Sequence, residues 1–263
     1  MYRIIFRTCD KVHSLHKAPR PFGLQKRELI QICFRSLVKS LEGFDHAIHV
    51  VADDISDELR EFFKEYPVVI TEGVFGNDES LRVALRLALS FDADDWVYFC
   101  EDDYLHTPEA FLWIDDILKN RESILLTKSR RGIKRFIPFD HRRSLHTMPL
   151  IIHPPDYPDR YHARLRYPSY LFVSKYYHWR QISNTTFTFL ASVQTLTQFR
   201  HELEFSTTGA NDGFLSKKLF AQDKYSGRAL CLSPIPGVAT HMHEEVMTPL
   251  VDWKTLVEKL SAT

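Results

Sequence analysis

The sequence predicts an α/β fold built on a doubly wound, mostly parallel sheet. Short apolar segments alternate with segments of helical periodicity through residues 1–118, and this alternation is typical of parallel sheets whose strands are joined by helices. Polar clusters follow several of the apolar segments, as in open α/β sheets, where ligands bind beyond the carboxyl ends of the strands. The chain of 263 residues is 44% hydrophobic, which is enough to bury a sizeable core.

The first half of the chain should contain four strands and four helices. The strands are expected at residues 2–6, 47–52, 68–70 and 96–100. The helices are expected at residues 24–41, 57–66, 81–89 and 108–118. Ser56 precedes the second of these helices and is expected to cap it, while Gly43 and Pro108 mark helix boundaries.

The second half begins with an irregular stretch, residues 128–180, that is rich in basic residues, proline and tyrosine. Regular structure is expected again as a strand at 185–190 and as helices at 193–203, 211–220 and 252–260. No linker composition separates the halves, so we expect one domain over residues 1–263, divided functionally into residues 1–118 and 119–263.

Charge and cysteine content exclude several classes of protein. The 34 basic residues balance the 34 acidic ones, so no overall charge favours nucleic acid as a partner. No apolar run has the length of a transmembrane helix, and the apolar part of MYRIIFRTCDKVH is too short for a signal peptide. The four cysteines stand alone, without a CxxC pair, which argues against a disulfide framework or zinc knuckle. A cytoplasmic location is therefore expected.

The strongest functional signal is the segment WVYFCEDDY at residues 96–104. An apolar strand there delivers Glu101, Asp102 and Asp103 to a sheet edge, where their mutual repulsion would be costly without a cation. Carboxylate oxygens suit Mg²⁺ or Mn²⁺ that also bridges a diphosphate. A solvated acidic turn before a helix explains the same residues.

A second signal is VVADDISDE at residues 50–58. Asp54 follows a buried strand and could accept hydrogen bonds from a nucleobase or from ribose hydroxyl groups. The alternative is that these acids serve only the entry of the next helix, where the helix dipole favours negative charge.

Four segments in a fixed order extend this pattern: FRTCD, ADDISDE, GNDESLRVALRLA and the strand followed by EDD. Together they resemble the nucleotide-sugar-binding half of family 2 glycosyltransferases of the GT-A fold, over roughly residues 1–118. Glu101 replaces the first Asp of the family's acidic triplet, and Ile55 replaces a customary glycine.

This resemblance implies a GT-A type fold with an acceptor-side C-terminal half and a nucleoside-diphosphate sugar donor, UDP-sugars being favoured. It further implies Mn²⁺ or Mg²⁺ held by Asp103, and a carbohydrate or glycolipid acceptor. The donor-binding residues that it implies are Arg7, Thr8, Asp54, Arg82, Glu101 and Asp102.

A weaker resemblance continues downstream, in TTFTFLASVQTLTQF and TTGANDGFLSKKL. Asn211 stands where the family has an acid, and Asp212 matches the following acidic position, which implies the general base of an inverting transfer. A helix N-terminus is expected to lower the pKa of Asp212; a plain helix cap is the alternative. In HMH, the resemblance implies His241 as a metal ligand with His243 in reserve, and a structural role for both is equally open.

Other features leave more than one interpretation. The basic run at 128–143 could contact a diphosphate, an anionic acceptor or, peripherally, a membrane surface, or it could be a solvated loop. Aromatic residues between 161 and 179 could stack on an acceptor sugar or pack beneath a lid. These aromatic residues are Tyr161, Tyr167, Tyr170, Tyr176, Tyr177 and Trp179.

Three other functions are alternatives to a glycosyltransferase. A sugar nucleotidyltransferase should carry a glycine-rich loop after the first strand, and FRTCDKV has no glycine. A non-catalytic nucleotide-sugar or carbohydrate-binding protein of the same fold would bind a donor without turnover. A metal hydrolase would need a helical His/Glu motif that the sequence lacks.

Overall fold

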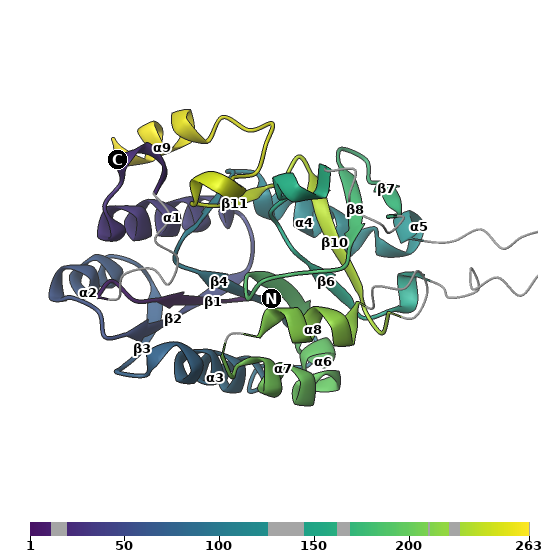
Figure 1. Ribbon diagram of the computed structural model, residues 1–263, viewed down its shortest axis with the longest axis horizontal. Coiled ribbons are helices and arrows are strands. Elements are labelled where there is room, and N and C mark those ends of the chain that lie inside the picture. The colour runs from purple at the N-terminus through teal and green to yellow at the C-terminus, as the bar shows by residue number, and fades with distance from the viewer. Residues whose placement is uncertain (12–19, 126–144, 162–168, 210, 221–226, 263) are drawn as a thin grey trace, which may run out of the picture.

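A nine-stranded sheet forms the centre of the computed structural model, which describes residues 1–11, 20–125, 145–161, 169–209, 211–220 and 227–262. The strands lie in the order β3-β2-β1-β4-β9-β6-β10-β8-β7 (Figure 1). Their bounds are β1 (Tyr2–Thr8), β2 (His46–Asp53), β3 (Val68–Gly73), β4 (Trp96–Glu101), β6 (Leu150–Ile152), β7 (Leu171–Val173), β8 (His178–Ile182), β9 (Phe189–Ser192) and β10 (Leu230–Ile235).

The first four strands pair in parallel, as do β6 and β10. Strands β9 and β8 pair antiparallel with both of their neighbours, so they alone run against the common direction of this sheet. The predicted α/β fold with a doubly wound, mostly parallel sheet is therefore confirmed. A second sheet pairs β5 (Tyr104–His106) with β11 (Ala239–His241) in antiparallel fashion.

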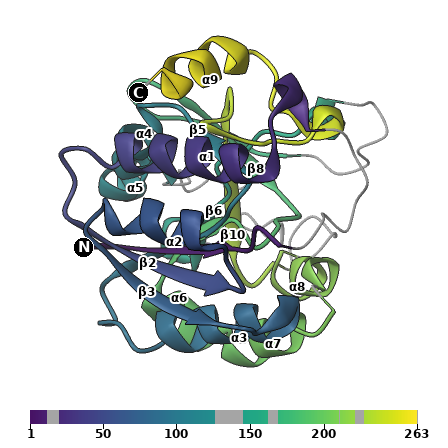
Figure 2. The same ribbon diagram turned by 90° about the vertical axis from the view of Figure 1, so that its left-hand side faces the viewer.

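The helices cover both faces of the large sheet (Figures 1 and 2). Their bounds are α1 (Lys26–Ser40), α2 (Asp57–Lys64), α3 (Gly76–Ala88), α4 (Ala110–Lys119), α5 (Arg121–Leu125), α6 (Val193–Gln198), α7 (Arg200–Ser206), α8 (Asp212–Leu219) and α9 (Trp253–Ser261). Short 3-10 helices occur at Pro21–Gly23, Leu145–Thr147, Pro158–Tyr161 and Glu244–Val246.

Alternation of side chains along the strands creates the two cores. In β1, Ile4 and Phe6 pack with α1, α2 and α4, whereas Ile5 packs with α3 and α6 to α8 on the opposite face. A third cluster lies outside α1, where Leu29 and Cys33 meet Trp253 of α9. Helix α1 is thus held between the sheet and α9, and its first turn reaches the carboxyl end of β4.

The N-terminal elements follow the predictions, with strands longer than expected by one to three residues and with α3 beginning at Gly76, five residues before its expected start. Ser56 caps α2 as predicted, because its Oγ accepts a hydrogen bond from Leu59 N at 3.3 Å. The helix expected at 193–203 is divided at Phe199 into α6 and α7, and the strand expected at 185–190 begins only at Phe189. Strands β5, β6, β7, β8, β10 and β11 had not been predicted.

All four cysteines are free. No helix in the described part of the chain is long and apolar enough to cross a membrane. The basic run at 128–143 and Tyr167 lie outside the described residues.

Candidate functional site

The candidate site lies at the carboxyl ends of β1, β2 and β4, which are neighbours in the sheet and run in parallel. In this register Arg7 lies opposite Glu101, and Thr8 lies opposite Ala52. The polar clusters that follow these three strands therefore meet at one edge, where open α/β sheets bind ligands.

Glu101 ends β4 and forms an ion pair with Arg7, whose Nη2 lies 2.6 Å from Glu101 Oε1. The Arg7 guanidinium also donates to Asn77 Oδ1 at 2.9 Å and so connects the sheet to the first turn of α3. Glu101 N donates to Thr188 Oγ1 at 3.2 Å. Removal from water raises the pKa of Glu101, although the charge of Arg7 opposes this shift.

Asp102 is buried and accepts three hydrogen bonds. Its Oδ2 accepts from Thr8 Oγ1 at 2.9 Å and from Cys9 N at 3.0 Å, and its Oδ1 accepts from Lys26 Nζ at 2.6 Å. Lys26 is the first residue of α1, where a positive charge is unfavourable to the helix dipole. The Asp102 carboxylate offsets that cost and fixes both α1 and the end of β1 to the end of β4.

Asp103 forms a hydrogen bond with His241 Nε2 at 3.0 Å. Pairing of β5 with β11 places His241 opposite Tyr104, whose ring stacks on the imidazole at 4.9 Å between centroids and 5° between planes. Burial opposes a charged imidazole, yet the attraction of Asp103 raises the pKa of His241. Conversely, burial would raise the pKa of Asp103, but His241 holds it well below its usual value.

His243 lies beside His241, with 5.8 Å between their ring centroids. Its Nδ1 is buried and has no hydrogen-bond partner within the described residues. The structure therefore brings Asp103 and His241 into direct contact and leaves His243 next to them.

Protein cations already compensate much of the acidic charge of this cluster. Arg7 pairs with Glu101 and Lys26 with Asp102, and His241 Nε2 is hydrogen-bonded to Asp103, so carboxylate repulsion does not by itself require a metal. Within the described ranges, no group of three or more His, Cys, Asp or Glu side chains is arranged to hold an ion. Asp103 and His241 offer one carboxylate and one imidazole, both of which are ligand types for divalent cations.

Asp54 lies at the end of β2 and adopts a left-handed backbone conformation with φ of 48°. Its side chain is 42% exposed and accepts a hydrogen bond from Lys11 Nζ at 2.6 Å. The neighbouring Asp53 is buried and accepts from Phe75 N and Gly76 N at 2.6 and 3.0 Å. Asp53 thus organises the entry of α3, while Asp54 remains accessible to a ligand.

Arg82 projects from α3 and donates to Glu79 Oε2 at 3.2 Å and to Thr208 Oγ1 at 3.3 Å. Gly209 N donates to Asp78 Oδ2 at 3.0 Å in the same region. These bonds join α3 to the segment that leads toward α8, and they give Arg82 a bridging position away from the contacts of Glu101 and Asp102.

Asp212 is the first residue of α8 and is partly buried. The N-cap is Asn211, whose Oδ1 accepts from Phe214 N at 3.1 Å, so capping does not explain Asp212. Burial raises the pKa of Asp212 and outweighs the backbone hydrogen bonds that lower it; the expected lowering by the helix N-terminus is therefore wrong. Ser216 of α8 accepts from Thr185 N at 3.3 Å, which places α8 against the chain entering β9.

Several residues that surround the three carboxylates were not predicted from the sequence to belong to the site. Tyr104 OH bonds to Tyr157 OH at 2.6 Å and to Thr186 Oγ1 at 3.0 Å. His153 Nδ1 bonds to the carbonyl of Thr188 at 2.9 Å. Only the position of Tyr104 directly after the acidic triplet could have indicated a role, because the other contacts come from distant segments.

The aromatic residues proposed for sugar stacking take different positions. Trp179 is fully buried, and Tyr177 stacks on Trp113 at 5.3 Å, which supports packing for these two. Tyr161 donates a hydrogen bond to Asp156. Tyr161, Tyr170 and Tyr176 are exposed.

No protein-family model and no curated protein matches the sequence. Among solved structures, the chain is similar to a nucleotidyl transferase from Methanothermobacter, with 10% identity, a TM-score of 0.47 and coverage of 100% of this chain and 98% of that one. It is similar to the galactosyltransferase LgtC in complex with donor and acceptor sugar analogues, with 9% identity, a TM-score of 0.47 and coverage of 99% and 95%.

A third similar structure is 2-C-methyl-D-erythritol 4-phosphate cytidylyltransferase from Francisella tularensis, with 12% identity, a TM-score of 0.42 and coverage of 99% and 98%. These similarities concern the course of the chain and assign no role to any residue of the site.

Proposed function

We propose that this chain is a metal-dependent glycosyltransferase that moves a sugar from a nucleoside-diphosphate sugar to a hydroxyl group of a carbohydrate or glycolipid. The observation that carries the proposal is the contact between Asp103 and His241, at 3.0 Å, beside Glu101 at the carboxyl edge of the sheet. This edge offers hard oxygen and imidazole ligands at a position where α/β sheets bind nucleotides. The resemblance of the acidic triplet to that of family 2 glycosyltransferases supports the same function.

The proposed donor site is formed by the ends of β1, β2 and β4. Asp103 and His241 would hold Mn²⁺ or Mg²⁺, with His243 beside them. When bound, such a cation neutralises negative charge that develops on the diphosphate leaving group. Asp54 is exposed enough to accept hydrogen bonds from ribose or from the imide of uracil. The resemblance to family 2 glycosyltransferases favours UDP-sugars as donors.

Several protein groups prepare this edge for a donor. Arg7, held by Glu101 and Asn77, keeps a positive charge at the end of β1. Thr8 and Lys26 immobilise Asp102 and thereby the backbone that carries Asp103. Arg82 is proposed to contact the donor, and its side chain is positioned by bonds to Glu79 and Thr208.

Asp212 is the proposed general base of an inverting transfer. Its carboxylate would accept the proton of the acceptor hydroxyl while that oxygen attacks the anomeric carbon and the diphosphate departs from the opposite face. A raised pKa makes this carboxylate a stronger base than an exposed aspartate, provided that the pH stays above that pKa. Helix α8 is held against the chain that precedes β9 by the hydrogen bond from Thr185 N to Ser216 Oγ.

Calorimetric titration with UDP, GDP and CDP, each with and without Mn²⁺, tests the donor site. Saturable binding of one nucleotide that Mn²⁺ strengthens is the expected result, followed by sugar transfer in assays with the matching nucleotide sugars and a panel of glycan acceptors. Absence of Mn²⁺-dependent binding for every nucleoside diphosphate would overturn the proposal.

Titration together with assays of the reaction products separates the alternative functions. Tight donor binding without transfer or hydrolysis would indicate a non-catalytic nucleotide-sugar-binding protein. Release of pyrophosphate from a nucleoside triphosphate and a sugar 1-phosphate would indicate a sugar nucleotidyltransferase. We further expect no nucleic-acid partner, at most peripheral contact with a membrane, and a cytoplasmic location.

A further inference from the structure

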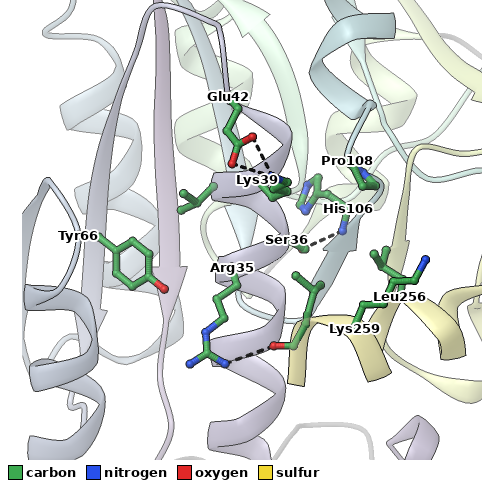
Figure 3. A pocket seen from close by; sticks show the side chains of 11 residues that line it. Arg35, Ser36, Lys39, Glu42, Tyr66, His106, Pro108, Leu256 and Lys259 are labelled. Atoms are coloured by element: carbon green, nitrogen blue, oxygen red, sulfur yellow. Dashed lines mark hydrogen bonds and ion pairs between the residues drawn. The ribbon is translucent and has the colours of Figure 1, made fainter. Parts of the chain in front are cut away.

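A cavity of about 440 Å³ lies between α1, α9 and the end of β5. Figure 3 shows Leu256 and Lys259 of α9 across from residues of α1, with His106 and Pro108 at one end of the cavity. Its volume lies in the range of sites that hold small organic molecules. No residue that lines this cavity belongs to the proposed donor or acceptor site.

The cavity is separated from the carboxylate cluster along α1. Lys26 meets Asp102 at the first residue of this helix, whereas Arg35 and Lys39 line the cavity nearer its C-terminal end. At a rise of about 1.5 Å per residue, these positions lie roughly 13–20 Å further along the helix. A ligand in the cavity would therefore occupy a second site.

One buried polar group in the cavity lacks a partner. His106 is 1% exposed and lines the cavity. Its Nε2 is bonded to Tyr98 OH at 2.8 Å, but its Nδ1 has no hydrogen-bond partner within the described residues. Burial lowers the pKa of His106 to about 3, so the ring is neutral at pH 7. Its Nδ1 is inaccessible from the cavity, so His106 contributes an uncharged wall and ligand recognition falls to the other lining residues.

The remaining lining combines an apolar surface with a surplus of positive charge. Val38, Leu256 and Leu260 supply aliphatic surface. Arg35, Lys39 and Lys259 carry positive charge, against the single acid Glu42.

The three cations differ in how far other protein groups engage them. Glu42 is engaged by Lys39 at 2.9 and 3.0 Å, and Arg35 donates to the carbonyl of Leu260 at a long 3.5 Å. Lys259 forms no ion pair with any residue of the described ranges. The cavity thus offers an apolar interior with unneutralised positive charge at its rim.

We propose that this cavity binds a small molecule with an apolar body and a single carboxylate group. The apolar body would lie against Val38, Leu256 and Leu260, and the carboxylate would meet the cations at the rim. A nucleotide does not match this site, because a diphosphate and ribose would place many polar atoms against aliphatic walls. The site is independent of the proposed transfer reaction.

Isothermal titration of the full chain with decanoate tests the proposal, using decan-1-ol and decylammonium as probes of the same chain length. Decanoate should bind with one-to-one stoichiometry and at least about tenfold more tightly than either analogue, because hydrogen bonds to charged groups are worth more than neutral ones. Equal affinity for decanoate and decan-1-ol, or no saturable binding of decanoate, would overturn it.

Two variants locate the binding. Lys259→Gln removes a rim charge, and Leu256→Trp fills the cavity; both should weaken decanoate binding by about tenfold or more, while Lys254→Gln, on the same helix but outside the cavity, should not. Unchanged binding in both variants would contradict the assignment to this cavity. Circular dichroism confirms that each variant is folded, and Mn²⁺-dependent nucleotide binding should persist in all of them, so that this site and the donor site are tested separately.

Discussion

Asp103 and His241 are separated by 138 positions in the sequence, yet their side chains are joined by a hydrogen bond of 3.0 Å. The small sheet of β5 and β11 creates this contact, because it pairs His241 with Tyr104, the residue after Asp103. Met242 N also donates to the carbonyl of Asp103 at 2.8 Å. The C-terminal segment is therefore fixed to the acidic triplet by backbone as well as side-chain bonds.

Substitution of Asp103 by asparagine tests the metal assignment. Asparagine keeps the size of the side chain and an acceptor for His241, but it removes the negative charge that a divalent cation needs. Because even residues that only support a ligand change metal affinity by about 10–100-fold, we expect the Mn²⁺-dependent gain in nucleotide affinity to fall by about 100-fold or more. Calorimetric titration with the nucleoside diphosphate, in the presence and absence of Mn²⁺, measures this gain.

Asp94→Asn is the matched control, because Asp94 is exposed and lies before β4. It should leave the titration unchanged. A folded Asp103→Asn protein that retains the full effect of Mn²⁺ would remove Asp103 from the metal site.

The pair of Lys26 and Asp102 should be important for stability. Both side chains are largely buried, with 20% and 10% exposed, and their charged atoms are 2.6 Å apart. In Lys26→Met the Asp102 carboxylate loses its cation but keeps Thr8 and Cys9 as donors, so we expect the free energy of unfolding to fall by about 2–3 kcal/mol. Denaturant unfolding at pH 7 measures the change.

An exposed ion pair provides the comparison. Lys39→Met breaks the pair with Glu42 and should cost less than about 1 kcal/mol. Adding Asp102→Asn to Lys26→Met should recover part of the stability, since no unpaired buried charge then remains. If Lys26→Met cost no more than Lys39→Met, the anchoring role of Lys26 would be excluded.

The sequence was informative where the signals are local. Strands β1, β2 and β4 are apolar runs of ordinary length. The acids that follow them were expected to meet at one edge of the sheet, and the parallel pairing of the three strands places them there. Ser56 could be recognised as a helix cap because capping depends on residues three positions apart. The apolar runs and the helix cap depend on residues that are close in the sequence and hardly on the rest of the fold.

The features that were missed depend on distant segments. Strands β6 and β7 have three residues each, which is too short for a periodic pattern, and they exist because neighbouring strands supply hydrogen-bond partners. Likewise, no local pattern could indicate that Lys26 contacts Asp102, since this depends on where the first turn of α1 docks. The pKa of Asp212 was predicted in the wrong direction because the position of a residue at a helix N-terminus does not reveal how deeply the fold buries its side chain.

Asp54 provides a test of nucleoside recognition. Its exposed carboxylate is bonded to Lys11, and no other protein donor contacts it within the described residues. If Asp54 binds base or ribose, Asp54→Ala should weaken the binding of the nucleoside diphosphate and of the intact donor equally, by roughly tenfold. Turnover at saturating donor should change little. Lys11→Ala serves as the comparison, because loss of the ion pair alone should have a smaller effect. An unchanged dissociation constant in Asp54→Ala would leave Asp54 with a role in helix entry only.

Asp212 is the most specific assignment in the proposed mechanism. Asn211 already caps α8, so Asp212→Asn should leave the helix and the thermal stability almost unchanged. Loss of general-base catalysis typically costs about 10²–10⁴-fold in rate, and we expect the turnover number to fall by that amount while donor affinity is retained.

The pH profile gives a second readout of the same residue. A general base must be ionised, and burial raises the pKa of Asp212 above the ordinary value for aspartate. Turnover of the unmodified chain should therefore decline as the pH falls through this raised pKa. The decline should begin at a higher pH than it would if the base were an exposed aspartate. The residual turnover of Asp212→Asn should lack this decline. Lys217→Gln, on the exposed side of α8, should keep both rate and profile. Near-normal transfer by Asp212→Asn would direct the search for the base to Glu101, whose pKa is also raised by burial.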